Sequence, residues 1–312
     1  MDLTISIICT NNKDLLKQCL NSIEKSKTGK YIYEIYVVDN CSKDNVSEMI
    51  ESCFPDVKVI TNKKCLGFSA NHNKVIKKAN GKYILLLNDD TIIEQNTLYN
   101  MIRFMDQNPN IGISGCKVFL SDGTVQKTCG NFPKFLGEFI RITIGLTFRS
   151  KISKNYIAWR SIGDFDYNSV RKVDWLSGVF MFIRSDLTKK VGLLDEKFFI
   201  YYEDVEYCFR TNSISDYEIV YNPYCNIKHL HGQTIKKVKY SDLVYNIKSC
   251  AYYFSKTKGT LWGKFIWYFS FFYYHLLYYT LMIFDISTFG RIKKIKIVKE
   301  KIALISKMLK ST

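Results

Sequence analysis

The sequence has ten cysteines but no CxxC pair, and its cysteines are scattered from Cys9 to Cys250. We therefore do not expect a zinc site built on closely spaced cysteine ligands. A chain of 312 residues can bury enough apolar surface to fold without a disulfide framework, so we expect buried thiols in a reducing compartment.

The N-terminal stretch "MDLTISIICT" has no basic segment followed by a long apolar run, so we expect no signal peptide.

Acidic side chains are scarce relative to basic ones. There are 29 Asp and Glu against 45 Lys and Arg, a formal net charge of +16. This balance predicts an anionic partner: nucleic acid, a phosphorylated ligand or an anionic lipid surface. No known nucleic-acid-binding module is recognisable, and the basic residues concentrate beside an apolar C-terminal stretch. We therefore expect no nucleic acid partner.

Apolar periodicity in the first 90 residues alternates between strand and helix. Strands are predicted at 3–10, 33–42, 57–62 and 82–90, and helices at 11–26, 45–54 and 69–81. Strands and helices that alternate at this spacing favour a mostly parallel sheet flanked by helices. Further along, the pattern predicts helices at 97–109 and from Glu203 onward, strands at 111–120 and 218–232, and a strand followed by a helix at 173–192. Residues 121–170 give no clear pattern.

Polar residues follow three of the predicted strands at the point where each strand ends. Ligands of open α/β sheets bind beyond the carboxyl ends of the strands, so we expect a binding site there. The residues in question are Thr10 and Asn11, Asp39 and Asn40, and Asn88, Asp89 and Asp90.

The stretch 84–93, "ILLLNDDTII", places two adjacent carboxylates after a buried strand. Adjacent carboxylates repel each other, and Mg²⁺ is commonly held by one or two carboxylates together with substrate phosphates. A divalent metal site is therefore one interpretation. The alternatives are a solvated loop or a helix cap formed by Asp90 and Thr91. Asp39 has an alternative of the same kind, an Asx-turn that ends its strand.

Five stretches carry a resemblance to a known family. In chain order they read "ISIICTNNKDLLKQCLNSI", "VVDNCSKD", "NKKCLGFSANHN", "LLLNDDT" and "WLSGVFMFIRSDLTKKVGLLDEKFFIYYEDVEYCFR". Together they resemble the inverting family-2 glycosyltransferases of the GT-A fold, a Rossmann-like α/β architecture. The likeness is greatest to rhamnosyltransferase-like members that extend bacterial surface polysaccharides. It covers about residues 3–235. We expect residues 1–235 to form the catalytic domain and residues 236–312 to form a C-terminal helical region.

The resemblance implies a donor site and a metal site. Thr10, Asn11 and Asp39 would contact the nucleotide base and ribose, and Asp90 would bind Mg²⁺ or Mn²⁺ bridging the diphosphate. His229 would be a further ligand of the metal or diphosphate, with His231 as second choice. Two histidines at strand spacing point to opposite faces, so only one is expected to serve. The other donor-site residues implied are Asn40, Gly67, Asn88, Asp89, Trp175 and Gly178, the last two lining the pocket of the acceptor and donor sugar.

The resemblance also implies that Asp204 is the general base and that its neighbour Glu203 shapes the acceptor site. The alternative is a pair of charges that offsets the dipole of a helix. Two departures from the family pattern stand out. Asn88 occupies the first position of the DxD-like motif, so this motif offers fewer carboxylates to a metal than an Asp-x-Asp would. His72 stands where the family usually has an asparagine, so whether this position contacts the donor is left open.

The residue types fit this chemistry. A divalent cation can neutralise charge on a departing diphosphate, and a carboxylate can accept the proton of the attacking hydroxyl. The implied reaction is an inverting transfer of a sugar from dTDP-rhamnose or a UDP-sugar to a lipid-linked glycan. Alternatives are another hexosyl- or N-acetylhexosaminyltransferase of the family and a non-catalytic scaffold. A sugar-1-phosphate nucleotidyltransferase is disfavoured because "TNNKDLLKQ" lacks a glycine-rich, basic signature.

Residues 236–312 have a different character. A basic, tyrosine-rich helix is predicted at 236–259, and residues 265–284 carry no formal charge. That run is long enough to cross a bilayer, but it holds five tyrosines where a spanning helix would have Leu, Ile or Val. We expect residues 259–312 to lie on the inner face of the cell membrane, with the enzyme cytoplasmic and peripheral. The alternative is an aromatic helical hairpin packed on the core or on a second subunit of a homodimer.

Overall fold

The computed structural model describes residues 1–141, 165–230 and 241–287. They form two compact units. Unit 1 comprises 1–132, 165–199 and 203–230, and unit 2 comprises 133–141, 200–202 and 241–287.

Unit 1 is built on a mixed sheet with strand order β3-β2-β1-β4-β11-β6-β12-β5. In that order the strands are β3 (Lys58–Thr61), β2 (Tyr33–Asp39), β1 (Leu3–Cys9), β4 (Tyr83–Asn88), β11 (Phe180–Arg184), β6 (Ile111–Leu120), β12 (Glu218–His229) and β5 (Thr91–Ile93). Short strands β7 (Val125–Gln126) and β9 (Arg171–Lys172) pair with β6 and β12, and β8 (Cys129–Gly130) pairs with β10 (Trp175–Leu176).

The pairing is parallel from β3 through β4 and again between β6 and β12, as the alternation of elements predicted. β11 runs antiparallel to both β4 and β6, and β5 runs antiparallel to β12. The first residue of β11 therefore lies beside the last residues of β4, which brings the loop before β11 to the carboxyl edge of the parallel strands.

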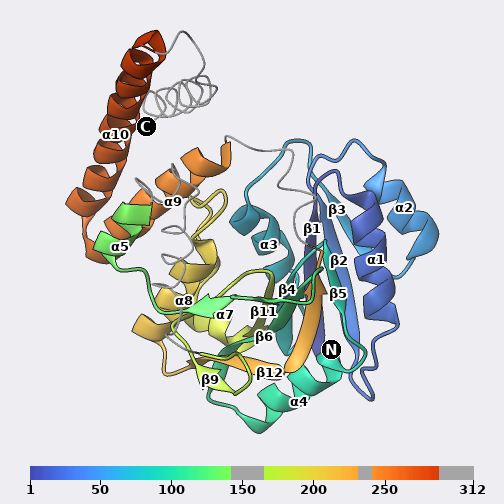
Figure 1. Ribbon diagram of the computed structural model, residues 1–312. Helices are drawn as coiled ribbons and strands as arrows, with labels where there is room; N and C mark the ends of the chain where they lie inside the picture. Colours follow the sequence, from blue (N-terminus) through green and yellow to red (C-terminus); the bar gives the residue numbers. More distant parts are fainter. Residues whose placement is uncertain (142–164, 231–240, 288–312) are drawn as a thin grey trace. The chain divides into compact units, whose positions relative to one another are not determined.

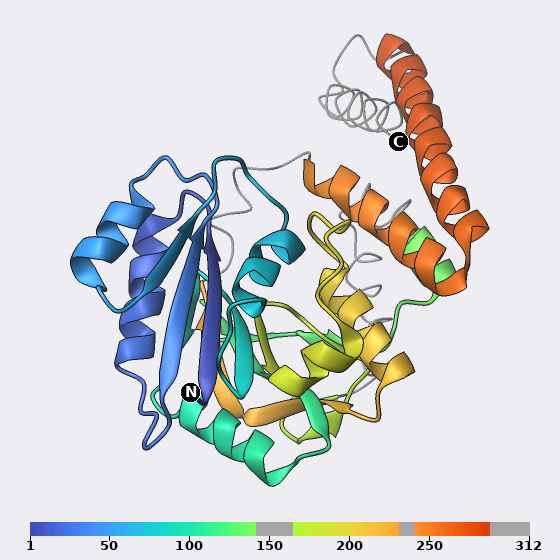
Figure 2. The same ribbon diagram turned by 180° about the vertical axis from the view of Figure 1, so that it is seen from behind.

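Helices of unit 1 cover both faces of the sheet. They are α1 (Lys13–Glu24), α2 (Val46–Cys53), α3 (Phe68–Ile76), α4 (Thr97–Gln107), α7 (Ser185–Val191) and α8 (Glu203–Ile214). α1 and α2 lie on one side of β1, β2 and β3, and α3 lies on the other (Figure 1 and Figure 2). Side chains that alternate along a strand explain this arrangement, because Leu3, Ile5 and Ile7 share a cluster with α1 whereas Val38 packs with Val75 of α3.

One local prediction was wrong, and one local alternative is excluded. The helix predicted to end at Gly81 ends at Ile76. Asp90 and Thr91 do not cap a helix: Thr91 begins β5, whose backbone pairs with β12, and its hydroxyl donates to the carbonyl of Asn88. The pairing of Thr91 with His229 of β12, 138 residues away in the sequence, outweighs the local capping preference of an Asp-Thr pair.

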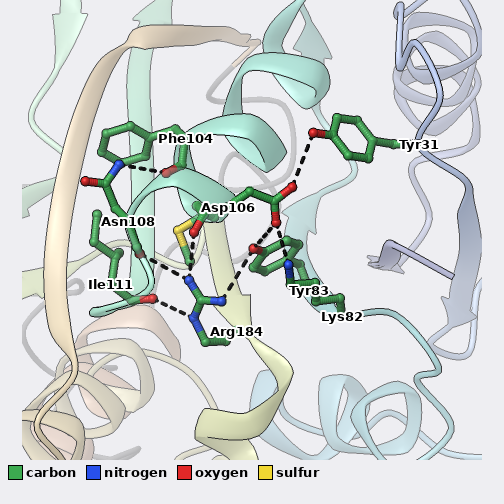
Figure 3. A network of polar contacts seen from close by, with 9 residues as sticks. Tyr31, Lys82, Tyr83, Phe104, Asp106, Asn108, Ile111 and Arg184 are labelled. Atoms are coloured by element: carbon green, nitrogen blue, oxygen red, sulfur yellow. Dashed lines mark hydrogen bonds and ion pairs between the residues drawn. The ribbon is translucent and has the colours of Figure 1, made fainter.

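The opposite edge of the sheet is fixed by the buried Arg184, shown in Figure 3. Its guanidinium donates to the carbonyl oxygens of Met105 (2.8 Å), Asn108 (3.2 Å) and Ile111 (3.0 Å) at and beyond the end of α4. The guanidinium thus donates to backbone carbonyls that have no N–H partner within α4. Tyr83 lies between Arg184 and Asp106, and its hydroxyl donates to the Asp106 carboxylate at 2.7 Å.

Unit 2 contains α5 (Phe135–Ile140), α9 (Ser241–Lys258) and α10 (Thr260–Ser287). A buried ion pair of 2.6 Å joins Glu138 to Arg141, and Arg141 also donates to Asn246 of α9 at 2.6 Å. Tyr202 donates to Glu138 at 2.6 Å, so the same polar cluster holds the short segment 200–202. Of the helix predicted at 236–259, residues 241–258 form α9 and residues 236–240 are outside the described residues. Residues 265–284 lie within α10, and residues 288–312 of the predicted surface-lying segment are outside the described residues.

No helix in the described ranges combines the length and the apolar character needed to cross a bilayer.

Candidate active site

The carboxyl edge of the sheet gathers the ends of β1, β2, β4 and β12. Cys9 pairs in register with Asp39, Ile8 pairs with Asn88, and His229 pairs with Leu120 at the end of β6. The antiparallel β11 adds the loop before it, because the Asn88 N–H donates to the Val179 carbonyl at 3.1 Å. Most of the residues that the sequence indicated therefore belong to this edge or to loops that leave it.

Asp90 and His229 lie in direct contact. Nε2 of His229 is 3.0 Å from Oδ1 of Asp90, and both side chains are buried. The contact is supported by the backbone, since the Leu230 N–H donates to the Asp90 carbonyl at 2.8 Å. On its other side, Nδ1 of His229 is 2.7 Å from Oε1 of Gln126 on β7.

This pair has the donor chemistry of a divalent cation site. The Gln126 oxygen is an acceptor, so Nδ1 of His229 carries a proton towards it, as metal-ligating histidines commonly do. Nε2 then faces the Asp90 carboxylate either as a second donor or with its lone pair beside a cation. The 3.0 Å separation is that of a direct hydrogen bond or ion pair, so one nitrogen and one carboxylate oxygen, both of types that divalent cations accept as ligands, lie side by side.

In the described ranges, no three His, Cys, Asp or Glu side chains are grouped as a metal cage. Asp90 and His229 alone would leave the remaining coordination positions to water and to substrate phosphates, which is the mode that Mg²⁺ prefers. His231 is outside the described residues.

Asp89 is buried next to Asp90. Burial, and secondarily the charge of Asp90, raise the pKa of Asp89 to about 7, while contacts with Asn12 and Cys9 oppose the rise. The side chain of Asn88 is half-buried, and its carbonyl accepts from Thr91.

Asp39 forms the turn that ends β2. Its Oδ1 accepts from the Ser42 N–H at 2.9 Å and its Oδ2 accepts from the Ser47 hydroxyl at 2.8 Å. Asn11 belongs to the same turn system, because its side-chain oxygen accepts from the Lys43 N–H at 2.7 Å. The carboxylate thus rigidifies a loop at the sheet edge, and a contact with a nucleotide base stays a prediction.

Asn40 ties three loops together. Its side chain donates to Thr10 (3.3 Å) and to the carbonyl of Leu66 (3.1 Å), and it accepts from Asn62 at 2.9 Å. Beyond Leu66, Gly67 begins α3 in close contact with Phe199, where a Cβ would lie 2.6 Å from the Phe199 carbonyl oxygen. These contacts position the loop that contains Gly67 over the ends of β1 and β2.

Asp204 is held by backbone donors. Oδ2 accepts from the Gly178 N–H at 3.1 Å, and Oδ1 accepts from the Val205 N–H at 2.8 Å in the first turn of α8. Gly178 is required by close packing, because a Cβ there would lie 2.8 Å from Cζ of Phe68. Trp175, also buried, donates its indole N–H to the Asn131 carbonyl at 3.0 Å.

Glu203 differs sharply from its neighbour. Burial, and then the charge of Asp204, raise the pKa of Glu203 well above its usual range. Its Oε2 has no hydrogen-bond partner among the described residues. Burial and the neighbouring charge therefore disfavour the ionised form of Glu203, whereas the Asp204 carboxylate is supported by two N–H donors.

The structure separates His72 from the site. His72 is fully buried on α3, with Nδ1 2.7 Å from the Ser6 hydroxyl of β1 and its ring against the edge of Phe68. The sequence left open whether position 72 contacts the donor, and in the structure the His72 side chain contacts core residues instead. Sequence reasoning missed Gln126, which lies on a two-residue strand inside the stretch that gave no pattern.

A sheet with this order, helices on both faces and polar residues at the carboxyl edge defines an α/β protein of GT-A type. A profile of "Glycosyl transferase family 2" matches residues 4–176. The chain belongs to that family.

Curated relatives are similar over part of their length. Rhamnosyltransferase WbbL of Escherichia coli strain K12 is 28% identical over 220 residues, which cover 66% of this chain and 75% of the relative. Low-salt glycan biosynthesis hexosyltransferase Agl10 of Haloferax volcanii is 25% identical over 214 residues, covering 67% of this chain and 61% of the relative. A phage-derived glycosyltransferase of Bacillus subtilis, SunS, is 32% identical over 90 residues, and the match spans only 20% of its length.

Solved structures share the fold. Staphylococcus aureus TarS has a TM-score of 0.53 at 17% identity, and the match covers 82% of this chain and 40% of TarS. GalNAc-T7, solved with UDP, GalNAc and Mn²⁺, has a TM-score of 0.57 at 14% identity, with 82% and 48% covered. A mannosyltransferase of Pyrobaculum calidifontis, solved with GDP-Man and Mn²⁺, has a TM-score of 0.53 at 11% identity, with 97% and 84% covered.

Proposed function

We propose that this glycosyltransferase is a metal-dependent, inverting enzyme that moves a sugar from a nucleotide-diphosphate donor to a hydroxyl of a lipid-linked glycan. The observation that carries the proposal is the contact of Asp90 with His229 at the same sheet edge that supplies the loop holding Asp204. The Asp90–His229 pair has the chemistry to bind a cation, and the Asp204 carboxylate has the chemistry to accept a proton.

Asp90 and His229 would hold Mg²⁺ or Mn²⁺, and the ion would neutralise the charge that develops on the departing diphosphate. Gln126 fixes the orientation of the imidazole through Nδ1. Support for the ion comes from the donor set itself and from Mn²⁺ in the two GT-A neighbours, GalNAc-T7 and the Pyrobaculum enzyme.

Asp204 would accept the proton of the attacking hydroxyl. The two N–H donors from Gly178 and Val205 keep the carboxylate oriented. Glu203 is the weaker candidate, because its burial and the charge of Asp204 raise its pKa and disfavour its ionised form, so we assign the base role to Asp204. Direct displacement by that hydroxyl inverts the anomeric centre and requires no second nucleophile from the protein.

The donor that we favour is dTDP-rhamnose, because a relative that is 28% identical over 220 residues is named a rhamnosyltransferase. The alternative is transfer of another hexose or N-acetylhexosamine from a UDP-sugar. TarS has been solved with UDP-GlcNAc and gives that alternative its support.

The acceptor that we propose is a lipid-linked glycan of surface polysaccharide synthesis, presented at the cytoplasmic face of the cell membrane. Support comes from the resemblance to transferases that extend bacterial surface polysaccharides and from the concentration of basic residues at the C-terminus. Peripheral association with the membrane is part of the same proposal.

A donor-hydrolysis screen tests the proposal. The purified chain is incubated with dTDP-, UDP- and GDP-sugars in Mg²⁺, in Mn²⁺ or in EDTA, and release of the nucleoside diphosphate is measured. We expect turnover with one donor class and its loss in EDTA. Metal-independent turnover would remove the metal role, and no turnover with any donor would count against the whole proposal.

The Asp204→Asn variant tests the base. We expect sugar transfer to fall by at least a thousandfold while the dissociation constant of the nucleotide stays within twofold, because the amide cannot accept the proton. Asp186→Asn, an exposed aspartate on α7, is the matched control and is expected to keep full activity. Full transfer by Asp204→Asn would exclude Asp204 as the base.

A further inference from the structure

One face of α10 exposes a line of large apolar side chains. Leu261, Phe265, Tyr268, Phe272 and Leu276 are between 49% and 78% exposed. They follow one another at steps of three or four residues, so they lie above one another on a single helix face. We call these five residues the α10 stripe. At a rise of about 1.5 Å per residue, the stripe is about 22 Å long.

The opposite face of α10 accounts for its packing within unit 2. Gly263, Ile266, Ser270 and Tyr274 are buried, and α10 makes its most extensive element contact with α9. The stripe is therefore not needed to hold the helix in place. One member of the stripe, Phe265, also packs within unit 2, because its ring contacts the rings of Phe135 and Phe139 on α5.

The stripe itself carries no charge, and residues 265–284 contain no Asp, Glu, Lys or Arg. The sequence that contains the stripe is nevertheless strongly basic: residues 236–312 hold 15 Lys and Arg against 3 Asp and Glu, so they carry +12 of the chain's net +16. An uncharged run within so basic a sequence is the composition of a helix that lies in the interface of an anionic bilayer.

We propose that the α10 stripe is a membrane-docking surface that inserts into the headgroup and upper acyl region of a bilayer containing anionic lipid, with α10 parallel to the membrane plane. Exposed apolar patches of this extent on a folded protein mark interaction sites. Tyr and Phe fit the boundary between headgroups and acyl chains, and Trp262 at the border of the stripe is 47% exposed.

Charge distinguishes this partner from a second copy of the chain. A dimer formed through α10 would bring two regions of net +12 together, whereas anionic lipid would neutralise them. The docking surface deepens the proposed function, because an enzyme that modifies a lipid-linked acceptor must work at the bilayer. It does not depend on the donor or metal chemistry of unit 1.

Vesicle sedimentation tests the proposal. The full chain is mixed with vesicles of phosphatidylcholine containing 30 mol% phosphatidylglycerol (the probe composition, roughly that of an anionic leaflet), and the bound fraction is compared with that on phosphatidylcholine alone. The test variant is Tyr268→Glu with Phe272→Glu, which places two charges in the middle of the stripe. We expect strong binding of the unmodified chain to the anionic vesicles, reduced by salt, and at least tenfold weaker binding of the variant.

The matched control is Ile214→Glu with Tyr224→Glu, two exposed apolar residues of unit 1 at 58% and 70% exposure. This control is expected to bind vesicles like the unmodified chain. Circular dichroism and donor hydrolysis establish that both variants are folded and that unit 1 is intact. Donor hydrolysis that fails in the unmodified chain while vesicle binding persists would reject the proposed function and leave the docking surface standing.

Two outcomes would overturn the docking surface. The first is equal vesicle binding by the stripe variant and the unmodified chain. The second is a dimer of the unmodified chain in lipid-free light scattering that becomes a monomer in the stripe variant, with no binding to anionic vesicles. That second result would assign the stripe to an interface between two copies of the chain.

Discussion

The backbone N–H of Gly178 donates a 3.1 Å hydrogen bond to Oδ2 of Asp204. The donor lies in the loop before β11 and the acceptor in the first turn of α8, so two segments that are 26 residues apart define the orientation of the proposed base. The antiparallel direction of β11 is what brings that loop to the carboxyl edge of the parallel strands.

Substitution of Gly178 by alanine is expected to slow sugar transfer. A Cβ at this position would lie 2.8 Å from Cζ of Phe68, so the loop or the ring must shift and the N–H moves relative to Asp204. We expect the turnover number to fall about tenfold, with little change in nucleotide affinity, because small misplacements of a catalytic group are costly. Steady-state kinetics and nucleotide titration measure the two effects.

The double variant Gly178→Ala with Phe68→Leu supplies the control, since the smaller side chain makes room for the new methyl group. Activity that returns towards that of Phe68→Leu alone supports the positioning role. A Gly178→Ala enzyme with unchanged turnover would show that the hydrogen bond does not orient the base.

Removal of the Gln126 side-chain amide is expected to weaken metal binding. Oε1 of Gln126 lies 2.7 Å from Nδ1 of His229, and partners of this kind typically contribute 10- to 100-fold to metal affinity. We expect Gln126→Leu to bind Mn²⁺ about tenfold more weakly in the presence of the nucleoside diphosphate, as measured by electron paramagnetic resonance. Gln107→Leu, an exposed residue at the end of α4, should bind as the unmodified chain does. Identical affinities of both variants would mean that His229 is not a ligand.

His72 makes the stability of the protein sensitive to acid. Burial lowers the pKa of His72 to about 3 from an ordinary value of 6.5. The unfolded chain therefore takes up a proton first as the pH falls, so stability that is complete above pH 6.5 is lost progressively from there towards pH 3. Between pH 7.5 and 5.0 this single group should lower the free energy of unfolding by about 2 kcal/mol.

Urea unfolding of His72→Asn at both pH values checks this expectation. The variant should show a loss between pH 7.5 and 5.0 that is smaller by about 2 kcal/mol than in the unmodified chain. The same loss in His72→Asn and in the unmodified chain would rule out His72 as the source.

Arg184 is expected to contribute strongly to stability and little to catalysis. Arg184→Met would leave the carbonyls of Met105, Asn108 and Ile111 without their donor in a buried site (Figure 3). We expect the free energy of unfolding to fall by about 3 kcal/mol, because buried acceptors without partners are costly and such losses are not additive. Urea unfolding measures the loss.

The matched variant is Arg184→Lys, which keeps the charge but cannot form the same fork of hydrogen bonds and should lose less stability than Arg184→Met. Donor hydrolysis in the absence of urea should be close to normal in both variants, since Arg184 lies at the edge opposite the site. A loss of activity without a loss of stability would place Arg184 in the function of the enzyme.

Most of the architecture of unit 1 follows from local patterns in the sequence. Continuous β-branched and apolar runs separated by amphipathic helices predicted β1 through β4, and the polar residues after Cys9, Val38 and Leu87 predicted which sheet edge would be functional. Motifs such as "VVDNCSKD" and "LLLNDDT" were sufficient to predict the family, because each one contains both the end of a strand and the polar residues expected to bind the ligand.

Other features were decided by contacts between distant parts of the chain. Pairing of Thr91 with His229 formed β5 at a position where the sequence also allowed a helix cap, and it placed Asp90 against the imidazole. The two-residue β7 brought in Gln126. No local pattern encodes a partner more than 100 residues away, because a strand of two or three residues has no periodicity of its own. The sequence determined which residue types could bind a cation and accept a proton, and the tertiary structure decided which of them meet.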